Sequence, residues 1–380
     1  QGSYPVIFLS FANVKGDNYK DARNSIVSAI NSAYQAHAYL VDSDVLTEGE
    51  KSFFSQLDQY VNDISADKQI VNEAIFRSLN NLSSCLARYY GKQVIILLDE
   101  YDTPMQEAYV YGFWNEFTSL IRNLFNATFK TNPYLYRAVM TGITRVSKES
   151  VFSDLNNLNV VTTTSEEYSS CFGFTEQEVF EALDTFGMEK EKERVKQWYD
   201  GFTFGRRRDV YNPWSITCFL DKGQYRTYWA STSSNGLIDR LIRTASGQVK
   251  QQMETLLQGM EIVVNFDEQI VFNQLEWDEN AIWSLLMASG YLKAEKIEYR
   301  GEAMEPWYHL KITNQETKIM FLRMFRDWFR SRGNGYESFV GALIHGDVEQ
   351  MNYYMNKIAL ASFSYFDVSG QEPEKFYHGF

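Results

Sequence analysis

Residues 94–100 read Val-Ile-Ile-Leu-Leu-Asp-Glu, five apolar residues that lead directly into two adjacent carboxylates. An apolar run of this length, rich in β-branched side chains, is typical of a buried strand. Gly91 lies just upstream, where a helix-ending glycine is expected after the helical pattern of residues 67–90. We therefore expect Asp99 and Glu100 at the carboxyl end of a strand, which is the edge where parallel sheets bind their ligands.

Two further strand patterns flank this one. Residues 4–11 are apolar and β-rich, and residues 135–144 form the next such run. Helical patterns lie between them. Asp17 is expected to cap the first, and the next cover residues 47–61, 67–90 and 112–131. Strand, helices, strand, helix, strand is the order of a parallel sheet with crossover helices, so we predict an α/β fold.

The pattern changes after Ser165. Helices are expected over residues 175–186, 190–199, 213–220, 237–244, 249–257, 318–330, 336–344 and 348–363. Thr175 and Glu178 have the spacing of a capping box, as do Thr47 and Glu50. Residues 261–312 alternate short strands with a helix at 280–288, which predicts a small α+β or winged-helix-like element.

Composition excludes several classes of protein. The chain has 380 residues and a net charge of -13, so it does not attract nucleic-acid backbones over its whole surface. Its three cysteines are far apart, which argues against a disulfide framework or a structural zinc site and favours a reducing cytoplasm. No apolar run reaches 18 residues, and we expect no membrane-spanning segment.

Asp99 and Glu100 have the chemistry of a phosphate-hydrolysing site. The first carboxylate could hold Mg²⁺ through water, and the second could polarise the attacking water. A buried strand that merely ends in solvated acids is the alternative. Asp102 could support the metal or cap the following turn.

The third strand bears on that choice. It ends in Thr141-Gly142-Ile143-Thr144-Arg145. In this arrangement Thr141 or Thr144 could face a γ-phosphate, and Arg145 could stabilise developing negative charge. We selected Thr144 and Arg145 as the candidate residues.

The phosphate cradle of such a site is missing from these residues. It requires the pattern GxxxxGK[ST], whose backbone N–H groups and lysine hold the phosphates. Gly91-Lys92 is the only Gly-Lys pair, and it precedes a strand instead of following one. We expect the cradle on a strand and helix upstream of residue 1.

The motifs together resemble the bacterial AAA-ATPase-like family. The matching segments are residues 4–11, 95–104, 141–148, 152–158, 172–176, 198–202 and 210–215. The resemblance implies a P-loop NTPase core in which residues 94–100 are the Walker B segment. It also implies ATP and Mg²⁺ as cofactors and a PD-(D/E)XK nuclease-like domain after the region covered here.

The resemblance further implies how the chain is divided. Residues 1–165 would be the NTPase-like core without its first strand and P-loop, and residues 166–260 a helical lid. Residues 261–371 would form a small α+β element and helical connector. Residues 372–380, with Glu374, would begin the nuclease-like domain.

Residues Arg206, Arg207 and Arg208 form the most basic run in the expected lid. They could contact nucleotide phosphates or form a solvated loop. The predicted function is the central part of a cytoplasmic, Mg-dependent ATPase, with nucleic acid a partner of the nuclease-like domain. The alternatives are a non-catalytic interaction scaffold and a nucleic-acid-binding module.

Overall fold

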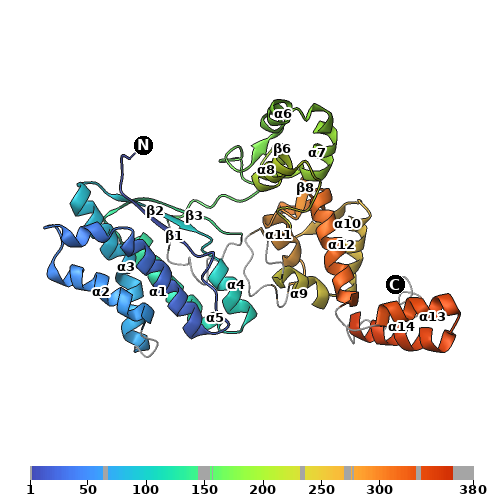
Figure 1. The fold of residues 1–380 in the computed structure, drawn as a ribbon, viewed down its shortest axis with the longest axis horizontal. Coiled ribbons are helices and arrows are strands. Elements are labelled where there is room, and N and C mark those ends of the chain that lie inside the picture. The colour runs from blue at the N-terminus through green and yellow to red at the C-terminus, as the bar shows by residue number, and fades with distance from the viewer. Residues whose placement is uncertain are drawn as a thin grey trace. The chain divides into compact units, whose positions relative to one another are not determined.

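The computed structural model describes residues 2–62, 67–143, 155, 157–231, 236–268, 275, 278–330 and 335–362. These residues form two compact units (Figure 1), the first ending at Val160 and the second starting at Val161. Within the described helices, none is both long and apolar enough to cross a membrane.

The first unit contains a parallel three-stranded sheet in the order β1-β2-β3. Its strands are β1 (Val6–Ser10), β2 (Val94–Asp99) and β3 (Leu135–Met140). Its helices are α1 (Tyr19–Gln35), α2 (Glu48–Asn62), α3 (Lys68–Tyr90), α4 (Thr103–Val110) and α5 (Trp114–Phe125), with short turns at Ala38–Asp42 and Asn126–Lys130. The predicted α/β class is confirmed.

The helix ends follow the expected capping chemistry with one exception. Asp67 accepts hydrogen bonds from the first turn of α3, and Gly91 ends that helix in the left-handed region at φ 64°. The Thr47–Glu50 capping box is present at α2. At α1 the cap is Asn18 and not Asp17, because the Asn18 side chain accepts the hydrogen bond from the Asp21 backbone N–H.

The two faces of the sheet have very different environments. Ile7 and Leu9 of β1 and Ile96 and Leu98 of β2 point to the face on which α1, α3 and α5 pack (Figure 1), and all four are buried. The other face also carries apolar side chains, but several of them are exposed: Val6, Phe8 and Val139. Only one face of this sheet is covered among the described residues.

The second unit contains two small antiparallel sheets. The first has the order β4-β6-β5, from β4 (Phe174–Thr175), β5 (Phe202–Phe204) and β6 (Arg207–Tyr211). It packs with α6 (Glu176–Thr185), a short turn at Glu189–Glu191, α7 (Lys192–Tyr199) and α8 (Pro213–Lys222). The predicted lid region is therefore not wholly helical. The sequence did not indicate these strands because β5 has only three residues and β6 begins with three charged ones.

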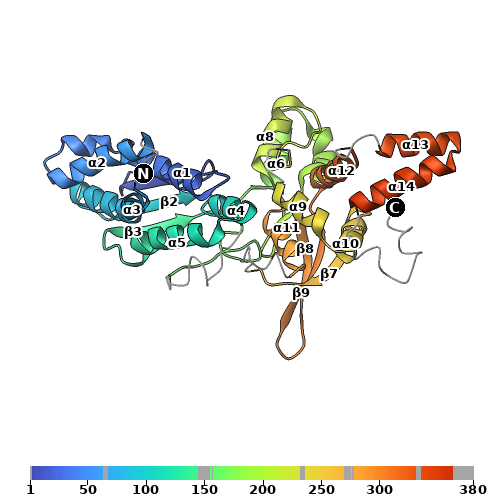
Figure 2. The same ribbon diagram turned by 90° about the horizontal axis from the view of Figure 1, so that it is seen from below.

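The second sheet has the order β7-β9-β8, from β7 (Ile262–Asn265), β8 (Leu292–Arg300) and β9 (Glu305–Ile312). The strands β8 and β9 form a long hairpin, which Figure 2 shows from the side. The helices around and after it are α9 (Gly236–Thr244), α10 (Gly247–Leu257), α11 (Ala281–Ala288), α12 (Gln315–Arg330), α13 (Gly335–His345) and α14 (Val348–Ser362).

Candidate functional site

Asp99 lies at the carboxyl end of β2, between side chains of both neighbouring strands. The Ser10 hydroxyl of β1 donates a hydrogen bond to its Oδ2 at 3.1 Å, and the Thr141 hydroxyl, just after β3, donates to its Oδ1 at 2.7 Å. The parallel register places Ser10 opposite Asp99, which explains why strands far apart in sequence converge here. The Asp99 carboxylate is held from two sides.

Thr141 also fixes the backbone after Asp99. Its hydroxyl oxygen accepts a hydrogen bond from the Glu100 backbone N–H at 3.1 Å while its proton is directed to Asp99. The Thr141 backbone continues the ladder, since its N–H donates to Leu98 and its carbonyl accepts from Tyr101. One residue thus orients both members of the acidic pair.

Glu100 has an unusual backbone conformation. Its φ is 51°, in the left-handed region that a residue with a Cβ seldom occupies. The Thr103 hydroxyl donates a hydrogen bond to its Oε2 at 2.9 Å. Strain of this kind concentrates at functional sites, and here it turns the chain sharply between β2 and α4.

Gly142 and Asp102 form a close contact beside this turn. A Cβ on Gly142 would lie 2.6 Å from Asp102 Oδ1 and 2.7 Å from the Tyr101 ring, so only glycine fits there. Asp102 is buried and stands at the N-cap position of α4, yet its side chain makes no capping hydrogen bond. Gln106 donates to its Oδ2 at 3.3 Å. The capping interpretation of this side chain is therefore wrong.

The acidic pair suits only one kind of metal site. The described residues contain no group of three His, Cys, Asp or Glu side chains that could hold a metal ion. Mg²⁺ in nucleotide sites instead uses one or two carboxylates and completes its shell with waters and phosphate oxygens. Asp99 with the Ser10 and Thr141 hydroxyls fits that limited role.

The structure describes some of the predicted site residues and not others. Asp99 and Glu100 lie where the sequence predicted. Thr144, Arg145 and Glu374 are outside the described residues, and their predicted roles stay predictions. Ser10 was missed, although the end of a strand parallel to β2 is the place where such a hydroxyl would be sought.

The three arginines belong to the second unit and do not act as one cluster. Arg206 pairs with Glu166 at 3.2 Å, and Arg208 pairs with Glu295 at 3.6 Å. Arg207 is opposite Phe204 in the β5–β6 pairing. Their predicted contact with nucleotide is not tested by this geometry.

Comparison with known proteins gives the same picture at coarser detail. Residues 1–152 match the family described as Predicted AAA-ATPase. The chain is also similar to the "Uncharacterized protein in vnfD 5'region" of Azotobacter chroococcum mcd 1, with 26% identity over 232 residues. That match covers 60% of this chain and 42% of the relative, so the chain spans less than half of that relative's length. No solved structure matches the chain significantly. Residues 1–152 therefore belong to the predicted AAA-ATPase-like family.

Proposed function

We propose that this chain is the central part of a Mg-dependent ATPase whose acidic pair is Asp99 and Glu100. The observation that carries the proposal is the Asp99 carboxylate, oriented between the Ser10 and Thr141 hydroxyls at the carboxyl edge of a parallel sheet. This edge is where such sheets bind ligands. Family membership of residues 1–152 supports the same class of activity.

The roles of the residues follow from their positions. Mg²⁺, when bound with nucleotide, would supply positive charge to the phosphates, and Asp99 would hold it through water. Thr141 keeps Asp99 and the Glu100 backbone in register. The exposed Glu100 carboxylate accepts a hydrogen bond from water and orients it for attack on the γ-phosphate.

A complete site also needs donors for the phosphates. Among the described residues, β3 pairs only with β2, and the sheet has an exposed apolar face on which Phe8 and Val139 are 59% and 52% exposed. Both features support a place for these donors. A strand paired with β3 and followed by a helix on that face would bury these side chains. Its turn would carry the GxxxxGK[ST] donors to the edge that holds Asp99.

Nucleotide titration tests the proposal. The chain alone is expected to bind MgATP with a Kd of about 1 mM, equivalent to about -4 kcal/mol, because it lacks the cradle. Asp99→Ala should abolish the binding, and Glu73→Gln, an exposed change on α3, should leave it intact. No thermal shift at millimolar MgATP would contradict binding by this chain.

A second experiment uses the complete protein of which this chain is proposed to be the central part, here called the parent protein. It distinguishes an ATPase from a non-catalytic scaffold. The parent protein is expected to hydrolyse ATP, and Glu100→Gln should lower kcat at least about 100-fold while MgATP still binds, as for loss of a group acting on the transition state. A parent protein that binds no ATP would favour the interaction scaffold.

The remaining predictions about the parent are also proposals. They are its cytoplasmic location, the lid and connector roles of residues 166–371, and coupling to a nuclease-like domain from residue 372. Binding of nucleic acid would be recognised by a steep salt dependence in filter binding, since phosphate contacts release counterions. A flat salt response would argue against the nucleic-acid-binding alternative.

A further inference from the structure

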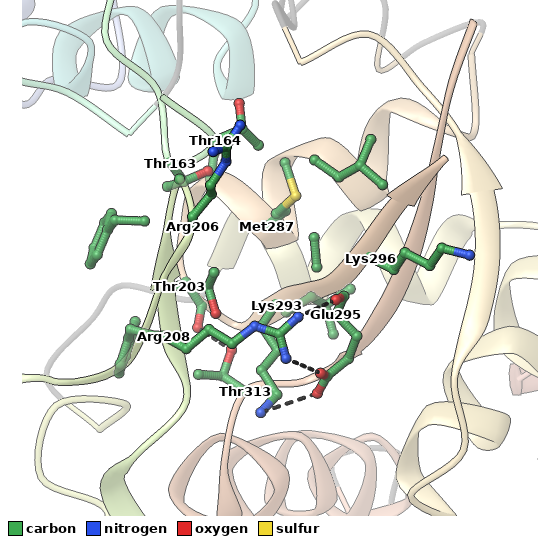
Figure 3. Close-up of a pocket in the computed structure, with 18 of the residues that line it drawn as sticks. Thr163, Thr164, Thr203, Arg206, Arg208, Met287, Lys293, Glu295, Lys296 and Thr313 are labelled. Atoms are coloured by element: carbon green, nitrogen blue, oxygen red, sulfur yellow. Dashed lines mark hydrogen bonds and ion pairs between the residues drawn. The ribbon is translucent and has the colours of Figure 1, made fainter. Parts of the chain in front are cut away.

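The second unit contains a cavity that no motif in the sequence indicates. Its volume is about 460 Å³, within the usual range for small-molecule sites. It lies between the β5–β6 hairpin, the start of β8 and the end of α11 (Figure 3). All of its lining residues belong to the second unit, so it is separate from the Asp99 site.

One part of the lining is apolar. Phe202 and Phe204 come from β5, Met287 from α11, and Leu292 and Ile297 from β8. Such a lining favours the apolar body of an organic ligand, because its burial removes hydrocarbon surface from water on both sides.

The other part of the lining carries an excess of positive charge. Arg208 and Lys293 both pair with the same carboxylate, Glu295, at 3.6 Å and 3.3 Å (Figure 3). The Arg208 guanidinium also donates to the Glu295 backbone carbonyl at 2.6 Å, which fixes its position. Two cations share one anion, so this group has one positive charge in excess.

The other two cations of the lining differ from this pair. Arg206 has its own partner, Glu166, and its side chain is 93% exposed. Lys296 shares Glu298 with Arg300, and both of these partners lie outside the lining. Arg208 and Lys293 are therefore the groups best placed to receive an anion within the cavity.

Three glycines allow close backbone approaches at this cavity: Gly205 and Gly290 line it, and Gly201 precedes the lining residue Phe202. A Cβ on Gly201 would lie 2.2 Å from the Thr313 carbonyl oxygen, and one on Gly205 would lie 2.7 Å from the Ser165 carbonyl oxygen. A Cβ on Gly290 would lie 2.7 Å from the Phe202 ring. All three residues have positive φ, so the backbone approaches that shape this cavity depend on glycine.

We propose that this cavity binds an amphiphilic organic anion. Its acidic group would lie against Arg208 and Lys293, where charge-assisted hydrogen bonds replace the shared pairing with Glu295. Its aromatic or aliphatic body would lie against Phe202, Met287 and Leu292. A preformed wall lowers the entropy that binding must overcome.

A matched pair of fluorescent probes tests the chemistry. 8-Anilinonaphthalene-1-sulfonate carries the ring system and one anion, and N-phenyl-1-naphthylamine carries the same rings without the sulfonate. The chain should bind the sulfonate probe at least about tenfold more tightly, the size expected for one charge-assisted contact. Decanoate, an aliphatic carboxylate, should displace it. Equal affinity for the two probes would overturn the proposal.

Two charge variants should shift the affinity in opposite directions. Lys293→Gln leaves Arg208 and Glu295 as a neutral pair and should weaken binding of the sulfonate probe about tenfold. Glu295→Gln leaves two cations without their carboxylate and should strengthen it. Arg243→Gln should leave the affinity for the sulfonate probe unchanged, because Arg243 pairs with Asp239 outside the lining. Equal effects of the three variants would contradict the assignment.

Two substitutions of one lining residue that differ in side-chain size then test where the probe binds. Thr203→Trp should fill the cavity and abolish binding, whereas Thr203→Val keeps the volume of the side chain and should retain it. Phe8→Asp alters the exposed sheet face of the first unit and should leave the signal unchanged. Loss of the signal in Phe8→Asp, with Thr203→Trp and Lys293→Gln both like wild type, would assign the probe to that sheet and overturn the proposal.

Discussion

The two units differ in how their sites are built. In the first unit the chemistry is visible in the sequence, as two carboxylates after an apolar strand, but the sheet that carries them has an uncovered apolar face. In the second unit a cavity exists without any catalytic pattern, and glycines allow the segments around it to approach closely. The first site is recognisable from its residue types but lies on a sheet with an exposed face. The second site is a formed cavity whose residues indicate no particular reaction.

This difference shows what each kind of signal can reveal. A motif identifies reacting groups, because chemistry restricts residue types at a strand end. A cavity depends on close approaches between distant segments, such as Gly201 against Thr313, and those approaches need only small residues. Substitutions that disturb these close approaches and substitutions that remove reacting groups should therefore affect the two units differently.

The largest loss of stability is expected at Gly201, where two segments of the second unit approach most closely. Gly201 has φ 119° and approaches the Thr313 carbonyl, so Gly201→Ala adds both backbone strain and a steric clash. We expect a loss of about 4 kcal/mol in the free energy of unfolding. Urea denaturation followed by tryptophan fluorescence measures it.

Gly223→Ala is the matched control for this change. Gly223 also has positive φ, at 60°, but it ends α8 where an added Cβ would meet only Met188 Cε, at an ordinary contact distance of 4.0 Å. The expected loss is only about 1 kcal/mol. Equal losses for the two variants would show that the close approach at Gly201 does not limit stability.

The next effect contrasts the two faces of the first sheet. Ile7 is fully buried and Phe8, its neighbour in β1, is 59% exposed. Ile7→Ala should lower the free energy of unfolding by about 3 kcal/mol, and Phe8→Ala by less than about 0.5 kcal/mol, since little surface leaves water there. Denaturant titration of both variants provides the measurement.

The same pair in the parent protein tests the proposed covering segment. If a strand and helix bury this face, Phe8→Ala should become as costly there as Ile7→Ala. A Phe8→Ala effect that stays small in the parent would mean that this face is not covered.

The sequence predicts the first unit better than the second for physical reasons. β2, α3 and the Thr47–Glu50 capping box were predictable because apolar periodicity and caps act within a few residues. Ser10 was not, since it reaches Asp99 through strand register, over 89 residues of sequence. The Lys293–Glu295–Arg208 group was equally hidden, because a bulged hairpin and a turn bring it together.

A smaller effect is expected from the hydroxyl that orients the acidic pair. Thr141→Val removes the hydrogen bonds to Asp99 and to the Glu100 backbone while keeping the β-branched shape. We expect a loss of about 1 kcal/mol in stability, because the group is exposed and water replaces part of the interaction. MgATP affinity should fall as well.

Thr141→Ser retains the hydroxyl and is the control. It should preserve nucleotide affinity, even if some β-propensity is lost. Equal nucleotide affinity in Thr141→Val and wild type would mean that Asp99 keeps its orientation without this contact.

The smallest effect is a pH dependence of the second unit. Burial, followed by a hydrogen bond and repulsion from Asp209, raises the pKa of Asp200 to about 7. Lys196, on the helix α7 that ends just before Asp200, is paired with Asp209 and Glu176 and opposes the shift in pKa. The native state therefore binds more protons than the unfolded state between about pH 4 and pH 7, and stability falls as the pH rises through this window.

The Asp200→Asn variant cannot titrate at this position. Its stability relative to wild type should increase from pH 4 to pH 7 and then stay constant, by about 1 kcal/mol, a reduced figure because solvent screens a half-buried carboxyl. Asp209→Asn removes the repulsion but not the burial, so its pH dependence should lie between the two. Parallel stability curves for Asp200→Asn and wild type, from thermal melts at each pH, would show that Asp200 titrates alike in both states. The carboxylate of Asp200, the residue before Gly201, would then make no contribution to the stability of the second unit.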